Sequence, residues 1–250
     1  MGKFDISTLG LDSSVWTRMF SLKHNESTQE FVKQKIKKVV DLTVLDVGCG
    51  SQPYRQILID SGYRYYSHDF NKYEPKLVPD FFGLHDQEGY NSNVEIDYIC
   101  DVLEINESYK YDLVICTEVL EHVPDPVKVL RKCKNLLKPG GKLLITAPAS
   151  SWTHQAPYYF SSGLSPMWFD YHFGKLEMKI TEGVIFGDLL SQVIQYTEAL
   201  EFNCTNVPLR IFGKFYRFFL KKSIDIKRPD IYYAPISQIC CISELSSVIE

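Results

Sequence analysis

A short apolar segment that ends in two glycines constrains this chain more strongly than any other feature. Residues 44–50 read VLDVGCG, so an apolar strand runs into a tight turn, and a helix is expected from Pro53 onward. A ligand can approach the backbone of such a turn closely. A dinucleotide fingerprint would need a third glycine where Pro53 stands, and the Asp46 carboxylate disfavours a pyrophosphate. The segment favours a ligand with a positive centre or an amino group; the alternative is a plain strand-to-helix turn.

The same alternation of strand and helix recurs along the first 150 residues. The expected strands lie at about 43–47, 63–69, 96–101, 112–116 and 142–147, and the expected helices at about 27–40, 53–62 and 126–137. The first helix would begin at the capping-box pattern of Ser27 to Glu30, and residues 138–141 would form a tight turn. For residues 71–95 we expect a short helix with loops. Apolar strands separated by helices indicate a parallel sheet with both faces covered.

The pattern changes after residue 148. Residues 152–173 hold eight aromatic side chains in twenty-two positions, which suits either a ligand wall or a cover for the sheet. Further strands are expected over 176–180 and 231–242, and further helices over 187–200 and 208–222. Because no linker separates the two parts, we expect a single domain over 1–250, with a core at about 40–150 and a second part at about 151–250.

Composition narrows the class of protein. The 250 residues carry a net charge of -4, so no basic excess supports binding to nucleic acid. No apolar run approaches the ~18–20 residues of a membrane span, and the first residues lack the layout of a signal peptide. The seven cysteines show no two-residue gap typical of a zinc or redox pair, so no metal site is predicted. These features favour a cytoplasmic protein without a transmembrane segment.

Acidic side chains end two further expected strands. Asp69 lies nineteen residues after Gly50, where a carboxylate can accept the ribose hydroxyls of a bound nucleoside. Asp101 ends the next strand, where it could accept the exocyclic amine of an adenine. The alternative for both residues is an ordinary aspartate at a turn, without a ligand.

Three motifs, in this order and spacing, resemble those of the class I S-adenosylmethionine-dependent methyltransferases. VLDVGCG at 44–50 is similar to their cofactor motif, EVLEHVPDP at 118–126 to the segment after the fourth strand, and LKPGGKLLITAP at 137–148 to the turn into the fifth. The resemblance covers about residues 40–150. It implies an α/β, Rossmann-like fold with a seven-stranded, mostly parallel sheet, an antiparallel last strand and helices on both faces. It also implies S-adenosyl-L-methionine as the cofactor.

The resemblance assigns roles to residues around that cofactor. Asp46 and the two glycines would form the turn beside its methionine part, Asp69 would hold the ribose, and Asp101 with Val102 would hold the adenine. The whole implied cofactor-binding set is Asp46, Gly48, Cys49, Gly50, Asp69, Asp101, Val102 and Glu118. Residues 51–54, SQPY, depart from the commonest family pattern, which leaves the contacts of that stretch open.

Two histidines are the candidate catalytic residues. Methyl transfer from a sulfonium requires an acceptor atom held in line, near ~3 Å, with water excluded. A hydroxyl acceptor also needs a base, for which we single out His122, after the fourth strand, and His154, near the start of the aromatic stretch. Either histidine could instead be structural. Residues 152–173 are the candidate acceptor wall, since Tyr and Trp stack on sugars and aromatic rings.

The leading hypothesis is therefore methyl transfer to a small-molecule or saccharide acceptor, with a hydroxyl as one candidate for the acceptor group. One alternative is an NAD-dependent oxidoreductase or epimerase, which Pro53 argues against, and another is a non-catalytic cofactor-binding module. Residues 209–222, LRIFGKFYRFFLKK, combine five basic side chains with four phenylalanines. Such a helix can lie on an anionic membrane, but more often packs its Phe face on a core, and we expect the latter. The acceptor atom, the oligomeric state and the pathway are not specified by these residues.

Overall fold

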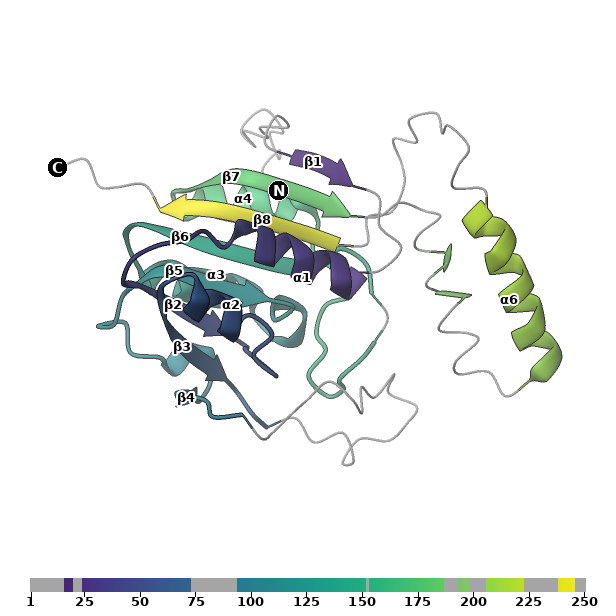
Figure 1. Cartoon of the computed structure of the whole chain (residues 1–250), viewed down its shortest axis with the longest axis horizontal. Helices are drawn as coiled ribbons and strands as arrows, with labels where there is room; N and C mark the ends of the chain where they lie inside the picture. The colour runs from purple at the N-terminus through teal and green to yellow at the C-terminus, as the bar shows by residue number, and fades with distance from the viewer. Residues whose placement is uncertain are drawn as a thin grey trace, which may run out of the picture.

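The computed structural model shows a twisted sheet with helices packed against it (Figure 1). It describes residues 16–19, 24–72, 94–151, 153–186, 193–194, 196–197, 206–222 and 238–245. The strands within these ranges are β1 (Trp16–Met19), β2 (Leu42–Val47), β3 (Tyr63–Asp69), β4 (Tyr98–Ile99), β5 (Tyr111–Thr117), β6 (Leu137–Pro148), β7 (Met178–Phe186) and β8 (Gln238–Leu245). They form one sheet in the order β1-β7-β8-β6-β5-β2-β3-β4. Neighbouring strands run parallel except at β8, which is antiparallel to both β6 and β7.

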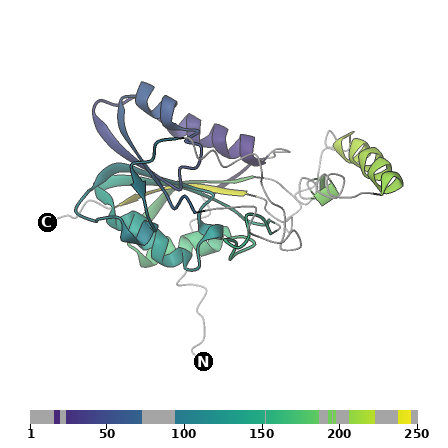
Figure 2. The same cartoon turned by 90° about the horizontal axis from the view of Figure 1, so that it is seen from below.

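Helices cover both faces of this sheet, as Figure 2 shows from below. The helices are α1 (His24–Lys35), α2 (Arg55–Asp60), α3 (Pro126–Asn135), α4 (Pro166–Lys175) and α6 (Val207–Lys222), with short 3-10 turns η5 (Val102–Glu104) and η6 (Leu120–His122). The pair α1 and α2 lies on one face, and α3 with α4 lies on the other. Helix α6 stands apart from both layers in the two views.

Two apolar cores form because successive side chains of a strand point to opposite faces. In β2, Leu45 and Val47 are fully buried on the α3–α4 face, where Phe169 of α4 packs. Val44, which precedes Leu45, is fully buried on the α1–α2 face, beside Phe31 of α1. Full burial of such side chains contributes about 1.5–3 kcal/mol each relative to exposure. The central strands are therefore held from both sides, which is why they contain near-continuous apolar runs.

The expected fold class is confirmed, with one difference in strand number. The sheet is mostly parallel, its last strand is antiparallel and helices lie on both faces, as the sequence predicts. Within the described residues the sheet has eight strands rather than seven. The additional strand is β1, which pairs in parallel with β7, Trp16 lying opposite Gly183. The proposed division of the chain as one domain stays a prediction.

Two helices differ in their bounds from the expected ranges. Helix α1 begins at His24, so the capping-box pattern at Ser27 lies inside the helix, and it ends at Lys35 rather than near residue 40. It ends early because Val39 and Asp41 donate backbone hydrogen bonds to the turn that follows α2. Helix α2 begins at Arg55, two residues late, because the glycine turn extends further than expected.

Two strands also differ from the expected ranges. Only Tyr98–Ile99 of the segment 96–101 is a strand, since the Asp97 carboxylate accepts hydrogen bonds from the N–H and the hydroxyl of Ser67. The expected turn at 138–141 lies within β6, where the register with β5 shifts between Tyr111 and Leu113. It is therefore an irregularity within one long strand.

Helix α4 occupies part of the aromatic stretch predicted as an acceptor wall. Ser165 caps it by accepting a hydrogen bond from the Trp168 N–H at 3.2 Å, and Pro166 supplies its first turn. Phe169 and Phe173 of this helix are buried against the sheet. The second half of residues 152–173 thus covers the sheet, which was the alternative interpretation of the stretch.

The remaining expectations are only partly testable. Helix α6 confirms the helix expected at 208–222, and β7 is longer than the strand expected at 176–180. Strand β8 confirms the part of the expected strand 231–242 that begins at Gln238, and it continues to Leu245. Residues 73–93, most of 187–200, and 231–237 lie outside the described residues.

We predict that the hydrogen bonds of Asp112 stabilise the contact between β2, β5 and β6, and that this stabilisation depends on pH. Its Oδ2 accepts hydrogen bonds from the N–H and hydroxyl of Thr43 and from the Lys138 ammonium, each at 2.7 Å. Replacement of Asp112 by Ala should lower the free energy of unfolding by about 2–3 kcal/mol, measured by urea denaturation at pH 7. Asp60→Ala, which removes one exposed bond to Gln56, is the control and should change it by less than about 0.5 kcal/mol.

The pH dependence of this effect has a definite sign. Burial raises the pKa of Asp112, but the hydrogen bonds from Lys138 and Thr43 outweigh it and lower the pKa below its ordinary value. The stabilisation is therefore complete above the ordinary aspartate pKa and is lost as the pH falls through the lower folded value. The difference between wild type and Asp112→Ala should shrink below about pH 4. A difference that stays constant down to pH 3 would contradict this assignment.

Candidate functional site

The glycine turn after β2 has a backbone conformation that glycine adopts without strain. Gly48 and Gly50 have φ angles of 67° and 48°. A Cβ at Gly48 would lie 2.4 Å from Cγ2 of Val119, whereas a Cβ at Gly50 would meet no described atom within 4 Å. Cys49 between them is buried, and its N–H donates to the His68 carbonyl at 2.9 Å. The space beside this turn therefore lies at Gly50, while Gly48 is in contact with the segment after β5.

The Asp69 carboxylate is held beside this turn by backbone hydrogen bonds. Because β2 and β3 are parallel and Val47 lies opposite His68, the two strands end at the same edge of the sheet. The N–H of Gly50 donates to Asp69 Oδ2 at 2.9 Å, and the N–H of Asn71 donates to Oδ1 at 2.7 Å. A carboxylate oxygen can accept more than one hydrogen bond. The predicted contact of Asp69 with two ribose hydroxyls is therefore chemically compatible with these backbone bonds.

Asp46 is a buried carboxylate, and only one of its two oxygens accepts a hydrogen bond within the described part of the chain. The Tyr65 hydroxyl donates to Asp46 Oδ2 at 2.9 Å, whereas Oδ1 has no hydrogen-bond partner among the described residues. Burial and, as a smaller effect, the charge of Asp69 raise the pKa of Asp46 to about 7, against the opposing effect of the Tyr65 hydrogen bond. A cationic ligand group at Oδ1 would satisfy this oxygen and favour its ionised form.

The predicted adenine contacts lie at the end of β4. Asp101 is exposed and caps η5, where its Oδ1 accepts a hydrogen bond from the Leu103 N–H at 2.9 Å. The Val102 side chain is buried in the α3–α4 core, so a contact from this residue would come through its backbone. Asp101 therefore has the structural role that was its alternative interpretation, and its contact with an adenine stays a prediction.

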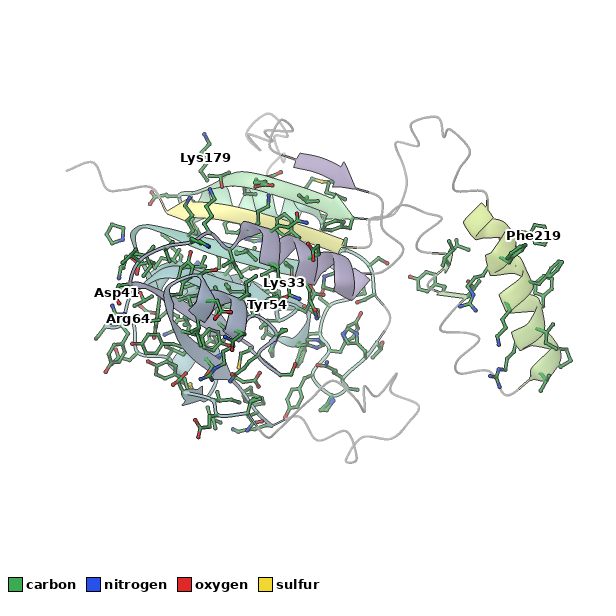
Figure 3. The ribbon with its side chains drawn as sticks, viewed as in Figure 1. Lys33, Asp41, Tyr54, Arg64, Lys179 and Phe219 are labelled. Atoms are coloured by element: carbon green, nitrogen blue, oxygen red, sulfur yellow. The ribbon has the colours of Figure 1, made fainter. Side chains whose placement is uncertain are left out.

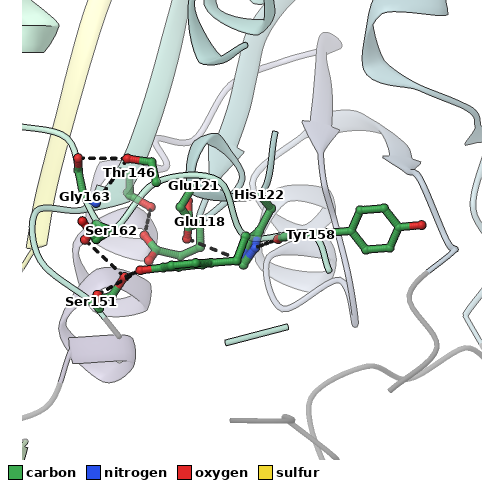
Figure 4. Close-up of polar contacts among 10 residues, drawn as sticks. Glu118, Glu121, His122, Thr146, Ser151, Tyr158, Ser162 and Gly163 are labelled. Carbon is green, nitrogen blue, oxygen red and sulfur yellow. Dashed lines mark hydrogen bonds and ion pairs between the residues drawn. The ribbon is translucent and has the colours of Figure 1, made fainter. Parts of the chain in front are cut away.

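The segment after β5 joins the glycine turn to the predicted catalytic residues. Glu118 has a φ of 54° and is fixed by Thr146 of β6, whose hydroxyl donates to Glu118 Oε1 at 2.6 Å. The next residue, Val119, is the one that touches the Gly48 position. Figure 4 shows Glu118 and Thr146 beside Glu121 and His122. Glu118 thus has a positioning contact, and its predicted role in cofactor binding is untested.

Glu121 and His122 form a buried pair of acid and base. Glu121 is almost fully buried, its Oε1 lies 3.6 Å from His122 Nε2, and its Oε2 has no hydrogen-bond partner in the described part of the chain. Burial and the charge of Glu118 raise the pKa of Glu121 well above its ordinary value. His122 Nδ1 lies 2.6 Å from the Tyr158 carbonyl oxygen, so Nδ1 carries the proton and Nε2 keeps a lone pair. Burial lowers the pKa of His122 to about 4.

His154 joins this pair from the aromatic stretch. Its ring contacts the His122 ring edge to face, with 4.8 Å between centroids, and lies 5.0 Å from the Tyr159 ring. The structure therefore brings the two predicted catalytic histidines together, although they are 32 positions apart in sequence. Glu121, His122 and His154 each offer a ligand atom within 4.8 Å of the others, and this set could also hold a metal ion.

Aromatic residues connect this cluster to the end of β3. The ring of Tyr158 packs edge to face on Phe70, with centroids 5.5 Å apart, and its carbonyl accepts from His122. The Tyr159 hydroxyl donates to the Ser151 carbonyl at 2.9 Å. The first part of the predicted acceptor wall thus lies beside both the histidines and the residues that follow Asp69.

Comparison with known proteins decides the family. A family model described as a methyltransferase domain matches residues 19–181. The chain belongs to this methyltransferase family. The predicted resemblance to S-adenosylmethionine-dependent methyltransferases is confirmed, and this family assignment argues against the NAD-dependent alternative.

The methyltransferase is similar to curated proteins named ubiquinone biosynthesis O-methyltransferase. The protein from Serratia proteamaculans is 34% identical over 119 residues, which are 46% of this chain and 46% of that protein. The protein from Xanthomonas oryzae pv. oryzae is 36% identical over 106 residues, 41% of each chain. The matched region thus spans less than half of these relatives.

A solved structure shows that the fold alone does not define the reaction. The crystal structure of the cyclase SpnF has a TM-score of 0.52 with this methyltransferase and 15% sequence identity, covering 88% of this chain and 80% of that one. Since this likeness extends to an enzyme named as a cyclase, the reaction must be argued from the residues of the site.

The residues around the glycine turn fit S-adenosyl-L-methionine, the cofactor of the family. Its amino group and sulfonium are positive, and the buried Asp46 Oδ1 is an acceptor that a positive group would satisfy. The open space at Gly50 lets a ligand approach the backbone beside Asp69. The cofactor prediction is confirmed at the level of the family, whereas the individual contacts remain predictions.

Sequence reasoning did not assign several residues that shape this site. Glu121 belongs to the motif EVLEHVPDP, where it directly follows the apolar pair Val119 and Leu120. An acidic residue at that position is a signal that could have indicated a role for Glu121. Thr146 is the one polar residue in LLITAP, which could have indicated a buried contact. No sequence signal pointed to Val119 or to the Tyr158 carbonyl, because their roles arise only from packing.

We predict that Gly50→Ala weakens cofactor binding more than Gly140→Ala does. Both glycines have positive φ and open space at the Cβ position, so both variants carry similar backbone strain. Only a Cβ at Gly50 would occupy the proposed ligand space. Calorimetry with S-adenosylmethionine should show at least a tenfold loss of affinity, about 1.4 kcal/mol, for Gly50→Ala and little change for Gly140→Ala. Equal affinities in the two variants would show that no ligand approaches Gly50.

We also predict that Asp46 makes cofactor affinity depend on pH. Because its pKa is about 7 in the ligand-free protein, binding a positive group below pH 7 must first release a proton. The ratio of wild-type affinity to that of Asp46→Asn should rise between pH 5.5 and 7.5, by up to tenfold per unit well below the pKa. The ratio cancels the titration of the ligand itself. A ratio that does not change with pH would place the positive group elsewhere.

Proposed function

We propose that this protein transfers the methyl group of S-adenosylmethionine to a hydroxyl of a small molecule. The observation that carries the proposal is the contact between His122 and His154 beside the segment that touches the glycine turn. Methyl transfer to oxygen needs a proton acceptor within reach of the hydroxyl. The names of the curated relatives, which are O-methyltransferases, support the same acceptor atom.

The two histidines have different environments, which assigns them different tasks. With a pKa of about 4, His122 is neutral at pH 7 and binds a proton weakly. Its Nδ1 is already engaged with the Tyr158 carbonyl, which fixes the ring orientation. We therefore assign proton acceptance to His154 and the positioning of His154 to His122. In this arrangement a ring nitrogen of His154 would accept the proton of the acceptor hydroxyl, which would make the acceptor oxygen nucleophilic toward the methyl group that a bound cofactor supplies.

The bound cofactor would supply an electrophilic methyl group with a neutral thioether as the leaving group. The protein's own residues then have two tasks, which are to orient the acceptor and to exclude water. Tyr158, packed on Phe70, and Tyr159, bonded to Ser151, present aromatic surface on the side of the histidines. These side chains suit a flat acceptor whose hydroxyl points toward His154.

An acceptor hydroxyl on an aromatic ring fits this site better than a sugar hydroxyl. A phenolic hydroxyl has a pKa near 10 and is deprotonated by a histidine far more readily than an alcohol. The saccharide acceptor remains the alternative within the same reaction. A non-catalytic protein would bind the cofactor but show no turnover with phenolic or saccharide acceptors.

A cytoplasmic location also stays a prediction.

The histidine assignment is tested by turnover of a panel of small phenols and monosaccharides with methyl-labelled cofactor. His154→Ala should lower turnover by ~10²–10⁴-fold with nearly unchanged cofactor affinity. His122→Ala should lower it less, and His122→Asn should recover part of the loss, because an Asn amide can still donate to the Tyr158 carbonyl. His172→Ala is the matched control, since the His172 ring packs on Trp168 and Tyr171 of its own helix, α4.

Two outcomes would contradict this mechanism. Full activity of His154→Ala on an accepted substrate would exclude His154 as the base. Loss of activity on chelation, with equal losses for Glu121→Gln, His122→Ala and His154→Ala, would instead indicate that these three side chains hold a metal ion.

A further inference from the structure

Helix α6 belongs to a long insertion in a hairpin. Strands β7 and β8 are adjacent and antiparallel, and Phe186 at the end of β7 lies directly opposite Gln238 at the start of β8. Antiparallel neighbours can be joined by a loop of 2–5 residues, yet residues 187–237 separate these two. Because β7 is parallel to β2, β3 and β6, the insertion leaves the sheet at the edge where the cofactor turn and the histidines lie. Figure 1 shows α6 on this side of the sheet.

The sequence of α6 separates basic from apolar side chains. Arg210, Lys214 and Arg217 are spaced by four and three residues, which places them in one stripe along the helix. Most of the remaining circumference is apolar, with four phenylalanines and no acidic residue anywhere in the helix. Since the whole chain carries -4 and α6 contributes five basic residues, the rest of the chain carries -9. Positive charge is therefore concentrated on this helix.

The apolar side of α6 is exposed. The exposed fractions of Ile211, Phe212 and Phe215 are 62%, 64% and 63%. With Pro208 these three line an open groove whose surface is almost entirely apolar. Within the helix, the Phe212 and Tyr216 rings stack with centroids 6.2 Å apart, and the Phe215 ring packs edge to face on Phe219. Packing of the Phe face on the core, which the sequence favoured, is not what the described residues show.

We propose that α6 docks on an anionic membrane surface, with its phenylalanines in the headgroup–acyl boundary and its basic stripe on lipid phosphates. Charge complementarity selects this occupant, since a helix without acids attracts a negatively charged surface and repels another copy of itself. Sixteen residues span only about 24 Å, so the helix lies on the membrane. None of the helices in the described ranges is long and apolar enough to cross a bilayer.

Docking through α6 would turn the active-site edge of the sheet toward the lipid. In Figure 3, Phe219 of α6 lies on the opposite side of the sheet from Asp41 and Arg64, which mark the edge where β2 and β3 begin. An acceptor that partitions into the membrane would then meet the site without leaving the interface. This inference goes beyond the proposed function and does not depend on it.

The test is sedimentation of the full chain with vesicles. Phosphatidylglycerol-containing vesicles should bind the protein at low salt, and pure phosphatidylcholine vesicles should bind it much more weakly. Arg210→Glu/Lys214→Glu should weaken binding at least about 25-fold, since each basic residue near such a surface contributes about fivefold. Lys37→Glu/Lys38→Glu makes the same change of charge at exposed positions just before β2, and should leave binding unchanged.

A second variant separates insertion from electrostatic attraction. Phe212→Ser/Phe215→Ser keeps every charge and should still weaken vesicle binding about tenfold or more. Cofactor affinity, measured on each variant, should match wild type and shows that the sheet is folded. Absence of binding to anionic vesicles, or equal weakening by the Lys37/Lys38 control, would overturn the proposal. So would dimerisation that the α6 variants abolish, which would identify a second copy of the chain as the occupant.

Discussion

The hydrogen bond from the Gly50 N–H to the Asp69 carboxylate joins the ends of two parallel strands, and the site is arranged around it. It requires that β2 and β3 pair in register, so that Val47 lies opposite His68. It also requires a glycine turn, because the backbone at Gly50 has positive φ. Strand β5 pairs with the other side of β2 and delivers Val119 and the histidine segment to the same edge. The residues proposed to bind the cofactor and those proposed to face the acceptor are thus both positioned by strands that pair with β2.

Much of this arrangement could be predicted because it depends on local pattern. VLDVGCG specifies a buried strand and a turn with little dependence on the rest of the chain. Parallel pairing then brings all carboxyl ends of the strands to one edge, so Asp69 and the residues after β5 could be expected there. His122 and His154 were selected by residue type and position, and the structure places their rings in contact.

The features that escaped prediction depend on contacts between distant segments. Burial of Glu121 and the raised pKa that follows arise from the packing of η6, which the motif alone does not reveal. Helix α4 begins at a Ser-Pro pair that resembles many loops, and its helical character is settled by Phe169 and Phe173 meeting the sheet. The end of α1 was missed because backbone bonds from Val39 to a later turn replace the last helical turn. Contacts between segments that are distant in sequence compete with local preferences in these cases. Such contacts cannot be predicted from the spacing of residues within one segment.

Val119 packs closely over Gly48, so the glycine turn and the segment that carries His122 are in direct contact. A ligand that displaces the backbone of the glycine turn pushes on Val119, and three residues later the same short segment carries His122. Binding of a cofactor at the turn would then change the orientation of the histidine rings through this contact. By reciprocity, an acceptor held against the histidines changes the affinity for the cofactor by the same factor that the cofactor changes the affinity for the acceptor. Any such coupling between the two molecules would pass through one methyl group of Val119, packed over the position of the Cβ that Gly48 lacks.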